Sequence, residues 1–401
     1  MLNSGSERVP TVLVEDVTWC WWTQPRATQI GDFFYIGGID SSGGVFAAAR
    51  NLRSGTVRRA VLARLEGDDH NNPALVVDSA RPPLAFYSRH DADNALRYRI
   101  GARPLDIAVW EAERRLLFDG VTTYAQAHVH GDEVHLFTRV GDTAWGYARS
   151  PDWGRTWGEP VTFLSLETDQ ETYMPTALLP GGRSLRVAVA GHPKSYESRP
   201  WHEIRVCLAD LATGDVSVPS SGERVANLQT GAGLPLRGAD LDLVYRVPPG
   251  RTLNLFDVSD GEPFEVAFVS KVRRDDVSLD TRYHVARATG AGWTVEELVS
   301  AGDIFGYIHA GFYVGGIAFP HGTRGGKTYI SRENSGIWHL ERWDRTDTGS
   351  WSATAVFDPS TTRIVRPWPV RAVEPELEIV ALALERYDDS YMGTLSHLVG
   401  R

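Results

Sequence analysis

The sequence has few cysteines and methionines, and it lacks a membrane-spanning segment and a recognisable signal peptide. It holds only two cysteines and three methionines among 401 residues. Cys20 and Cys207 match no zinc or redox spacing, so we expect two buried free thiols. No apolar run approaches the ~18 residues of a membrane-spanning helix. The first ten residues, MLNSGSERVP, lack a basic and an apolar region, so no signal peptide is visible. The location is unknown from this: a cytoplasmic protein and a trimmed secreted one both fit.

An excess of positive charge is also missing. The formal net charge is −10, and non-specific nucleic-acid binding needs a basic surface. We therefore expect no nucleic-acid partner and no membrane partner. An anionic carbohydrate is still compatible with this charge, because a few arginines can reverse the potential within one cleft.

A phrase repeats with variation along the first half of the chain. It begins at His70 (HNNPAL), at Tyr124 (YAQAHV) and at Tyr173 (YMPTAL), so the leading residues lie 54 and then 49 positions apart. A β-type run follows each copy, and repeats of this length are typical of propellers and solenoids. With no linker in the chain, we predict an all-β fold: one seven-bladed β-propeller of four-stranded antiparallel blades over residues 1–401.

The remaining blades are predicted from weaker copies of the phrase. Inner strands are expected to begin near Trp22, near Ala310 and near Arg366, with one more at Leu241 to Val247. Seven blades then take about 57 residues each. Six or eight blades are also compatible with the sequence, because the repeated phrase is hardest to recognise in residues 212–305.

An Asp-box motif, S-x-D-x-G-x-T-W, covers Ser150 to Trp157. In this pattern the aspartate binds the turn backbone, the glycine takes a conformation closed to other residues, and the tryptophan plugs between strands. The motif predicts a propeller hairpin and carries no information on catalysis.

Five residues have positions that suit a functional site. His70, Tyr124 and Tyr173 lead predicted inner strands, while His90 and Arg139 end the strands that follow. Equivalent positions in consecutive blades meet at one end of the axial funnel. Asp68, Asp69 and Asn71 surround His70 in the sequence, and we expect one of them to orient its imidazole ring. A histidine oriented in this way suits general acid or base work near neutral pH. Each residue alone is more often a satisfied structural group.

This set of residue types favours elimination over hydrolysis. Most glycosidases use two carboxylates, which the leading positions do not supply. β-Elimination from a uronic acid needs a group that neutralises the carboxylate, a base and an acid. Arg139 suits the first role through bidentate pairing. Tyr124 and the two histidines suit the others, provided that nearby positive charge lowers the pKa of the tyrosine.

The same residues resemble a known family, the seven-bladed propeller lyases that cut ulvan, within the Asp-box repeat enzymes. The resemblance rests on DDHNNPAL ending near Leu75, YSRH ending at His90, Tyr124 with Arg139, and Tyr173. Weaker likeness extends to the C-terminal blades, and residues 212–305 show the least.

The resemblance implies roles for individual residues. Tyr124 would be the catalytic acid or base, assisted by His70 and His90, with the choice of proton acceptor between Tyr124 and His70 left open. Arg139 would hold the uronate carboxylate and Tyr173 would position the sugar. His192 and Lys194 are added as candidate substrate-binding residues, although relatives often carry arginine where this chain has lysine. No cofactor and no catalytic metal are expected, and a structural metal stays open.

Two other functions remain open. A glycoside hydrolase could use the same scaffold, either as an α-L-rhamnosidase acting on rhamnose-glucuronate or as a sialidase-like enzyme. A propeller that binds glycans without catalysis is the third possibility, because fold alone does not determine function.

Overall fold

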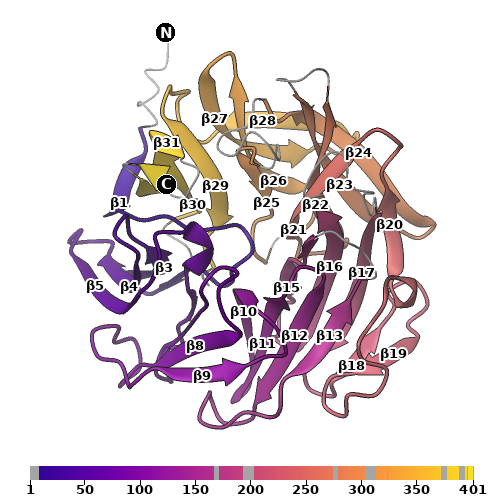
Figure 1. Cartoon of the computed structure of the whole chain (residues 1–401). Coiled ribbons are helices and arrows are strands. Elements are labelled where there is room, and N and C mark those ends of the chain that lie inside the picture. Colours follow the sequence, from indigo (N-terminus) through magenta and orange to yellow (C-terminus); the bar gives the residue numbers. More distant parts are fainter. Residues whose placement is uncertain are drawn as a thin grey trace.

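The computed structural model describes residues 9–166, 171–192, 203–273, 279–302, 313–322, 324–371, 377–387, 393–394 and 396–400. Over these residues the chain forms seven antiparallel sheets that follow one another around a ring (Figure 1). The prediction of a seven-bladed, all-β propeller is therefore confirmed. The described helices are two short 3-10 turns, η1 (Asp69–Asn71) and η2 (Gly238–Asp240), and none of the described residues forms a helix long and apolar enough to cross a membrane.

The first three blades each contain four consecutive strands in simple order. Blade 1 comprises β2 (Ala27–Ile30), β3 (Phe33–Ile39), β4 (Gly44–Asn51) and β5 (Val57–Arg64). Blade 2 comprises β6 (Ala74–Val76), β7 (Leu84–Tyr87), β8 (Ala95–Ile100) and β9 (Arg114–Leu117). Blade 3 comprises β10 (Thr122–His130), β11 (Glu133–Val140), β12 (Ala144–Ser150) and β13 (Val161–Ser165).

Blade 4 is the irregular one, because its sheet has seven strands. They are β14 (Glu171–Tyr173), β15 (Thr176–Leu178), β16 (Ser184–His192), β17 (Glu203–Asp210), β18 (Asp215–Ser217), β19 (Arg224–Asn227) and β20 (Asp242–Arg246). Blade 5 returns to four strands: β21 (Thr252–Val258), β22 (Glu265–Arg273), β23 (Leu279–Thr289) and β24 (Gly292–Ser300). Blade 6 comprises β25 (Gly316–Ala318), β26 (Lys327–Asn334), β27 (Ile337–Arg345) and β28 (Trp351–Ala355).

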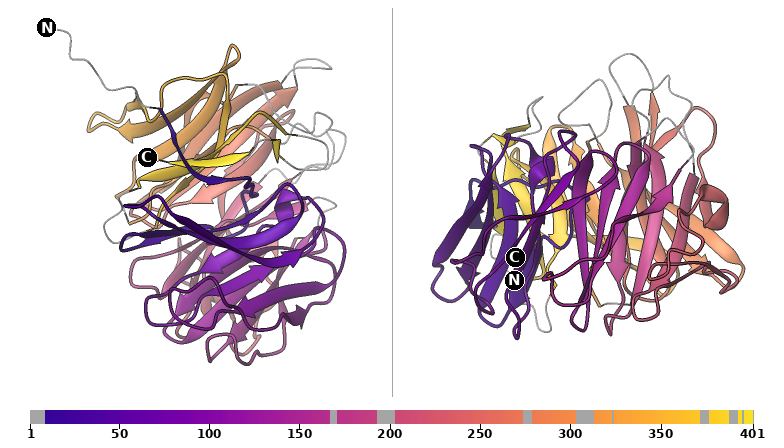
Figure 2. Two further views of the ribbon diagram at one scale, coloured as in Figure 1. Left: turned by 90° about the vertical axis from the view of Figure 1, so that its left-hand side faces the viewer. Right: turned by 60° about the horizontal axis from the view of Figure 1, so that its bottom comes forward.

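Blade 7 closes the ring with both ends of the chain. Its strands are β29 (Arg363–Pro369), β30 (Ile379–Leu384), β33 (His397–Gly400) and, outermost, the N-terminal β1 (Thr11–Glu15). β1 pairs antiparallel with β33, so the first and the last strand of the chain lie side by side in this blade (Figures 1 and 2). A small hairpin of β31 (Arg386–Tyr387) and β32 (Gly393–Thr394) lies beside it.

One predicted blade start is wrong. The segment Leu241 to Val247 was expected to begin the inner strand of the fifth blade, but β20 pairs with β17 and belongs to blade 4. The inner strand of blade 5 is β21, which begins at Thr252. The predicted start near Ala310 lies outside the described residues, and the inner strand of blade 6 is described from Gly316.

Burial falls from the axis outward, as the propeller geometry requires. Every residue of the inner strand β21 is buried, whereas the outer strands β5, β9 and β28 expose at least half of their side chains. The segment that precedes blade 1 fills the middle of the ring. Gln24 forms an isolated bridge with Gln126 of β10, and the Trp22 indole donates to the carbonyl of Leu255 in β21 at 3.1 Å.

The Asp-box has the predicted hairpin role between β12 and β13. Asp152 accepts from the amide and the hydroxyl of Thr156, both at 2.7 Å. Gly154 has φ +79°, and the Trp157 ring packs against Phe86 and Tyr98 of blade 2. The motif therefore fastens blade 3 to its neighbour and lies away from the candidate site.

Candidate functional site

A tight 3-10 turn before β6 places His70 at the inner rim of blade 2. The Asp68 carboxylate caps this turn by accepting from the backbone amide of His70 at 2.9 Å. Two asparagines then tie the turn to its surroundings. Asn71 accepts from the amide of His90 at 2.6 Å, and Asn72 accepts from the amide of Cys20 at 2.9 Å. The polar run at residues 68–72 is thus used to build the turn.

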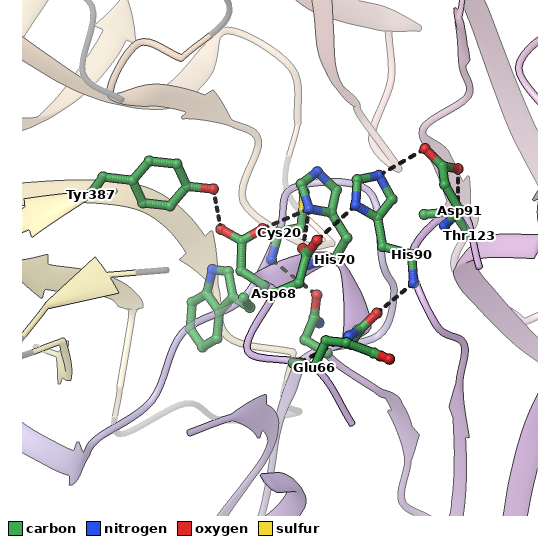
Figure 3. A network of polar contacts seen from close by, with 12 residues as sticks. Cys20, Glu66, Asp68, His70, His90, Asp91, Thr123 and Tyr387 are labelled. Atoms are coloured by element: carbon green, nitrogen blue, oxygen red, sulfur yellow. Dashed lines mark hydrogen bonds and ion pairs between the residues drawn. The ribbon is translucent and has the colours of Figure 1, made fainter. Parts of the chain in front are cut away.

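His70 and His90 form a stacked pair bridged by one carboxylate. Their ring centroids lie 4.0 Å apart with an angle of 9° between the planes. Asp68 contacts Nδ1 of His70 at 2.6 Å through one oxygen and Nδ1 of His90 at 2.7 Å through the other (Figure 3). Nε2 of His90 lies 3.3 Å from Asp91. Both rings therefore direct Nδ1 at the same carboxylate, which fixes their orientation.

The charges around this pair favour the protonated form of His70. Burial by itself lowers the pKa of His70, but Cys20 and the carboxylates of Asp68 and Asp69 outweigh burial and raise the pKa well above its ordinary 6.5. Burial would raise the pKa of Asp68, but the two imidazoles hold it well below its ordinary 3.8. At neutral pH the centre therefore combines an imidazolium with an ionised carboxylate.

Tyr124 enters the site through a distortion of β10. The strand bulges between Thr123 and Ala125, and Tyr124 has φ +60°, a backbone conformation that is rare for a side chain of this size. Its ring lies 5.6 Å from that of His70 and 5.9 Å from that of Tyr173, centroid to centroid. Strain of this kind tends to persist where a side chain is aimed for function.

The condition set for Tyr124 as a base, that nearby positive charge lowers its pKa, is not met. Burial is the largest influence and raises the pKa of Tyr124 well above 10.0, and the neighbouring Arg139 opposes this only in part. Tyr124 is 1% exposed. The tyrosine is therefore a neutral phenol in the resting site and is available as a proton donor.

Arg139 lies under both tyrosine rings and is completely buried. Its guanidinium carbon is 4.9 Å from the Tyr124 ring centroid and 5.5 Å from that of Tyr173. Nη2 donates to Asp91 at 3.2 Å, and Nη1 lies 3.5 Å from Glu171. Within the described part of the chain, Nε and Nη1 complete no hydrogen bond. A buried guanidinium with unsatisfied donors is costly, so it indicates a place for an acceptor.

Burial works against the charge of Arg139, but the surrounding tyrosines and carboxylates outweigh it and hold its pKa well above the ordinary value. Tyr173 completes this side of the site. Its hydroxyl donates to Glu171 at 2.7 Å, and its ring lies 3.9 Å from that of Trp22. Tyr173 therefore belongs to the wall around Arg139 rather than to the histidine pair.

Blade 7 supplies a second wall that the sequence reasoning missed. Asp69 is completely buried and accepts from Nη1 of Arg366 and from the hydroxyl of Tyr387, both at 2.5 Å. Its other oxygen lies 3.1 Å from Nδ1 of His70. Arg366 has φ +55°, also at a bulge, in the inner strand β29.

Tyr313, which precedes β25, reaches the opposite edge of the His70 ring. Its hydroxyl lies 3.4 Å from Nε2 of His70, and its ring stacks on Trp21 at 5.0 Å. A polar chain thus runs from Tyr387 through Asp69 to the two histidines and on to Asp91 (Figure 3). The only local hints in the sequence were the acidic residues before His70 and the arginine opening a weak copy of the phrase.

The structure brings together five of the seven predicted site residues. His70, His90, Tyr124, Arg139 and Tyr173 lie in contact around one centre. The backbone of His192 ends β16 and pairs with Glu171, which places this residue on the blade beside Arg139. Lys194 lies outside the described residues. The prediction that an acidic neighbour orients His70 agrees with the contacts to Asp68 and Asp69.

Two overlapping groups have the geometry to hold a metal ion. They are Cys20, Asp69 and His70, and Asp68, His70 and His90, with ligand atoms within 4.8 Å of one another. Both groups would use His70, whose Nδ1 already contacts Asp68. A metal would therefore replace the proton shared between them, because a ligating histidine must be neutral.

Comparison with known proteins finds likeness in sequence over part of the chain and likeness in fold over nearly all of it. A family model described as BNR repeat-containing family member matches residues 33–199. An ulvan lyase from Nonlabens ulvanivorans is 33% identical over 113 residues, which is 24% of this chain and 24% of that protein. An ulvan lyase from Pseudoalteromonas sp. (strain PLSV) is 32% identical over 113 residues, covering 24% and 23%. The matched part thus spans about a quarter of the length of these relatives.

A solved structure of a polysaccharide lyase, an ulvan lyase, matches nearly the whole chain. The TM-score is 0.72 at 17% identity, over 98% of this chain and 96% of that one. The same values hold for that lyase bound to -[GlcA(1-4)Rha3S]-. At this identity the likeness shows the fold, and it agrees with the seven blades described above.

Proposed function

We propose that this protein is a lyase that cleaves the glycosidic bond at a uronic acid by β-elimination. The observation that carries the proposal is the buried Arg139, whose Nε and Nη1 lack hydrogen-bond partners among the described residues beside Tyr124 and the histidine pair. A carboxylate bound there would accept a charge-assisted hydrogen bond from one of these donors. Neutralising it would acidify the adjacent C5 proton, the first requirement of the reaction.

The proton positions suggest separate roles for His70 and Tyr124. Both groups hold their protons at neutral pH, since both pKa values are raised. A histidine loses its proton closer to neutral pH than a phenol does. We therefore assign the base to the form of the protein in which His70 has lost its imidazolium proton, and the acid to Tyr124.

The step then balances without any further group. His70 takes the C5 proton, the electron pair forms the C4–C5 double bond, the C4–O4 bond breaks, and Tyr124 gives its proton to O4. Return of the proton from His70 to Tyr124 restores the active form, with neutral His70 and a neutral phenol. Asp68 and His90 orient His70, and Arg139 stabilises the charge that develops on the carboxylate.

The finer assignment is a glycan in which the uronate is joined to rhamnose, as in ulvan. The two ulvan lyases matched over part of the chain support it. Support also comes from the fold neighbour, which binds a glucuronate-rhamnose unit. The aromatic rings of Trp22 and Tyr173 beside Arg139 offer apolar surface for a sugar ring.

Hydrolysis on the same scaffold fits the site less well. A glycosidase needs a carboxylic acid that keeps its proton near neutral pH. Here the pKa of Asp68 is lowered by its two histidines despite burial, and the pKa of Asp91 is lowered by Arg139 and His90 against burial. Both carboxylates are therefore ionised and engaged with cations.

Incubation with ulvan tests the proposal. We expect new ultraviolet absorbance from an unsaturated uronate together with new reducing ends. Replacing Tyr124 by Phe should lower kcat by about 10²- to 10⁴-fold, the usual contribution of a general acid, while ulvan binding is retained. Reducing ends without absorbance would favour a hydrolase, and binding without turnover would favour a glycan-binding propeller.

A further inference from the structure

A groove on the outer wall of the propeller has a composition unlike the rest of this acidic chain. It lies between β5 of blade 1 and β8 and β9 of blade 2, and its volume is about 570 Å³. That is within the roughly 300–1,000 Å³ of sites that hold small ligands. Five arginines and two glutamates supply its charged lining: Arg64, Arg89, Arg97, Arg99, Arg115, Glu66 and Glu113.

The charge of the groove is opposite in sign to that of the whole protein. The lining residues sum to a formal +3, from five arginines and two glutamates, whereas the chain as a whole carries −10. A cleft lined by one sign of charge focuses its field and raises the local concentration of oppositely charged ligands. The groove should therefore attract anions even though the protein as a whole repels them.

The back of the groove is rigid. Arg97 is 6% exposed and donates to Asp93 at 2.6 Å, and Arg99 donates to the carbonyl of Glu111 at 2.7 Å. Arg99 also donates to the Tyr87 hydroxyl at 3.3 Å. These bonds hold two guanidinium groups in place behind the lining.

The arginines at the rim of the groove are held by fewer and more exposed contacts than those at the back. Arg64 is exposed and bonds the Ser42 hydroxyl at 3.1 Å, and it forms no ion pair with a carboxylate of the described residues. Arg115 is 59% exposed in its side chain and lies 3.2 Å from Glu113. Exposed ion pairs of this kind contribute little, so an incoming anion can compete for both arginines. A groove that existed only to join two blades would need no such excess of positive charge.

The inner end of the groove reaches the candidate site. Arg89 precedes His90 directly and pairs with Glu66. The carbonyl of Glu66 accepts from Asn71, the residue next to His70, at 3.1 Å. The groove and the histidine pair are thus joined through Glu66 and Asn71 and through the neighbouring residues Arg89 and His90.

We infer that this groove is a second binding site for the same anionic glycan, holding carboxylate-bearing sugars that lie beyond the bond to be cleaved. The inference rests on the proposed function for the identity of the chain, and on the arginines for its location. Guanidinium groups bind carboxylates in a bidentate manner. The groove would hold long chains on the enzyme between successive cleavages and would contribute little to the binding of single sugars.

Binding experiments on the full chain test this without requiring turnover. The probes are polymeric ulvan, glucuronic acid as a monomer, and dextran as a neutral polymer, measured by calorimetry at two salt concentrations. The test variant is Arg64→Ala combined with Arg115→Ala. The control is Arg53→Ala. The Arg53 side chain is 76% exposed, lies in the turn between β4 and β5, and pairs with Asp32 in the turn between β2 and β3, outside the lining of the groove.

The double variant should bind polymeric ulvan about three- to tenfold more weakly than the wild type, as expected for two exposed charge contacts, and its affinity should depend less steeply on salt. Arg53→Ala should bind like the wild type. Unchanged polymer affinity in the double variant, or an equal loss in Arg53→Ala, would overturn the inference. If the wild type binds ulvan through the groove but forms no unsaturated product, the proposed function fails and the groove assignment stands.

Discussion

Replacing Asp68 by Asn perturbs the centre of the site with almost no change in volume. The carboxylate accepts from both Nδ1 atoms, at 2.6 and 2.7 Å, and from one backbone amide. An asparagine keeps one acceptor but turns an NH₂ group toward one of the rings. At least one hydrogen bond to a charged group is lost, which costs about 1.5–3 kcal/mol.

The loss of unfolding free energy caused by Asp68→Asn should depend on pH, and it should shrink on both the acid and the alkaline side. The pKa of Asp68 is lowered, so its stabilisation is present above its ordinary 3.8 and is lost as pH falls through the folded value. The pKa of His70 is raised, so the stabilisation of its charged form is complete below its ordinary 6.5 and is lost as pH rises through the folded value. The gap in unfolding free energy between wild type and variant is therefore widest between about pH 4 and about pH 6.5 and narrows on either side.

Urea unfolding followed by tryptophan fluorescence from acid to alkaline pH measures this gap. Asp93→Asn is the matched control, because Asp93 binds Arg97 at 2.6 Å and has no histidine partner in the structure's described part. The difference in unfolding free energy between the wild type and Asp93→Asn should narrow on the acid side only. A gap for Asp68→Asn that stays constant across the pH range, or one below about 0.5 kcal/mol, would refute the bridging role of this carboxylate.

Three further changes should have measurable effects. Tyr387→Phe removes one donor from the carboxylate beside His70, so the pKa of His70 in NMR titration should rise; a fall would contradict the contact. Arg139→Lys keeps the charge but loses the planar guanidinium group, and KM for ulvan should rise by roughly tenfold. An unchanged KM would show that Arg139 does not bind the uronate carboxylate. Gly154→Ala places a side chain at φ +79° and should lower stability by about 1 kcal/mol or more. Gly158→Ala, with a nearest neighbour at 3.7 Å, should be close to neutral.

The blade repeat was readable because each blade restates the same local pattern of strands and turns. The failure came at Leu241 to Val247. A five-residue segment such as DLVYR, the sequence of β20, fits an inner or an outer strand equally well. The choice depends on pairing with β17, a contact that local sequence does not encode.

The site could be predicted only where the repeated phrase marks it. His70, Tyr124 and Tyr173 lead copies of the phrase, and their partners follow at short spacing. Arg366 and Tyr387 reach Asp69 across 297 and 318 residues of chain. No local pattern connects segments so far apart, and only closure of the ring brings them together.

That closure has a consequence for how the protein is made. Asp69 belongs to the second blade, but both of its blade 7 donors are translated near the end of the chain, and their blade is completed by β1 from its beginning. During synthesis the early blades emerge and pair first, while the histidine centre lacks the groups that balance its carboxylates. The charges around His70 are complete only after the segments that carry Arg366 and Tyr387 have emerged and the ring has closed. A chain cut short within blade 7 would therefore keep every residue of the repeated phrase and still lack a finished site.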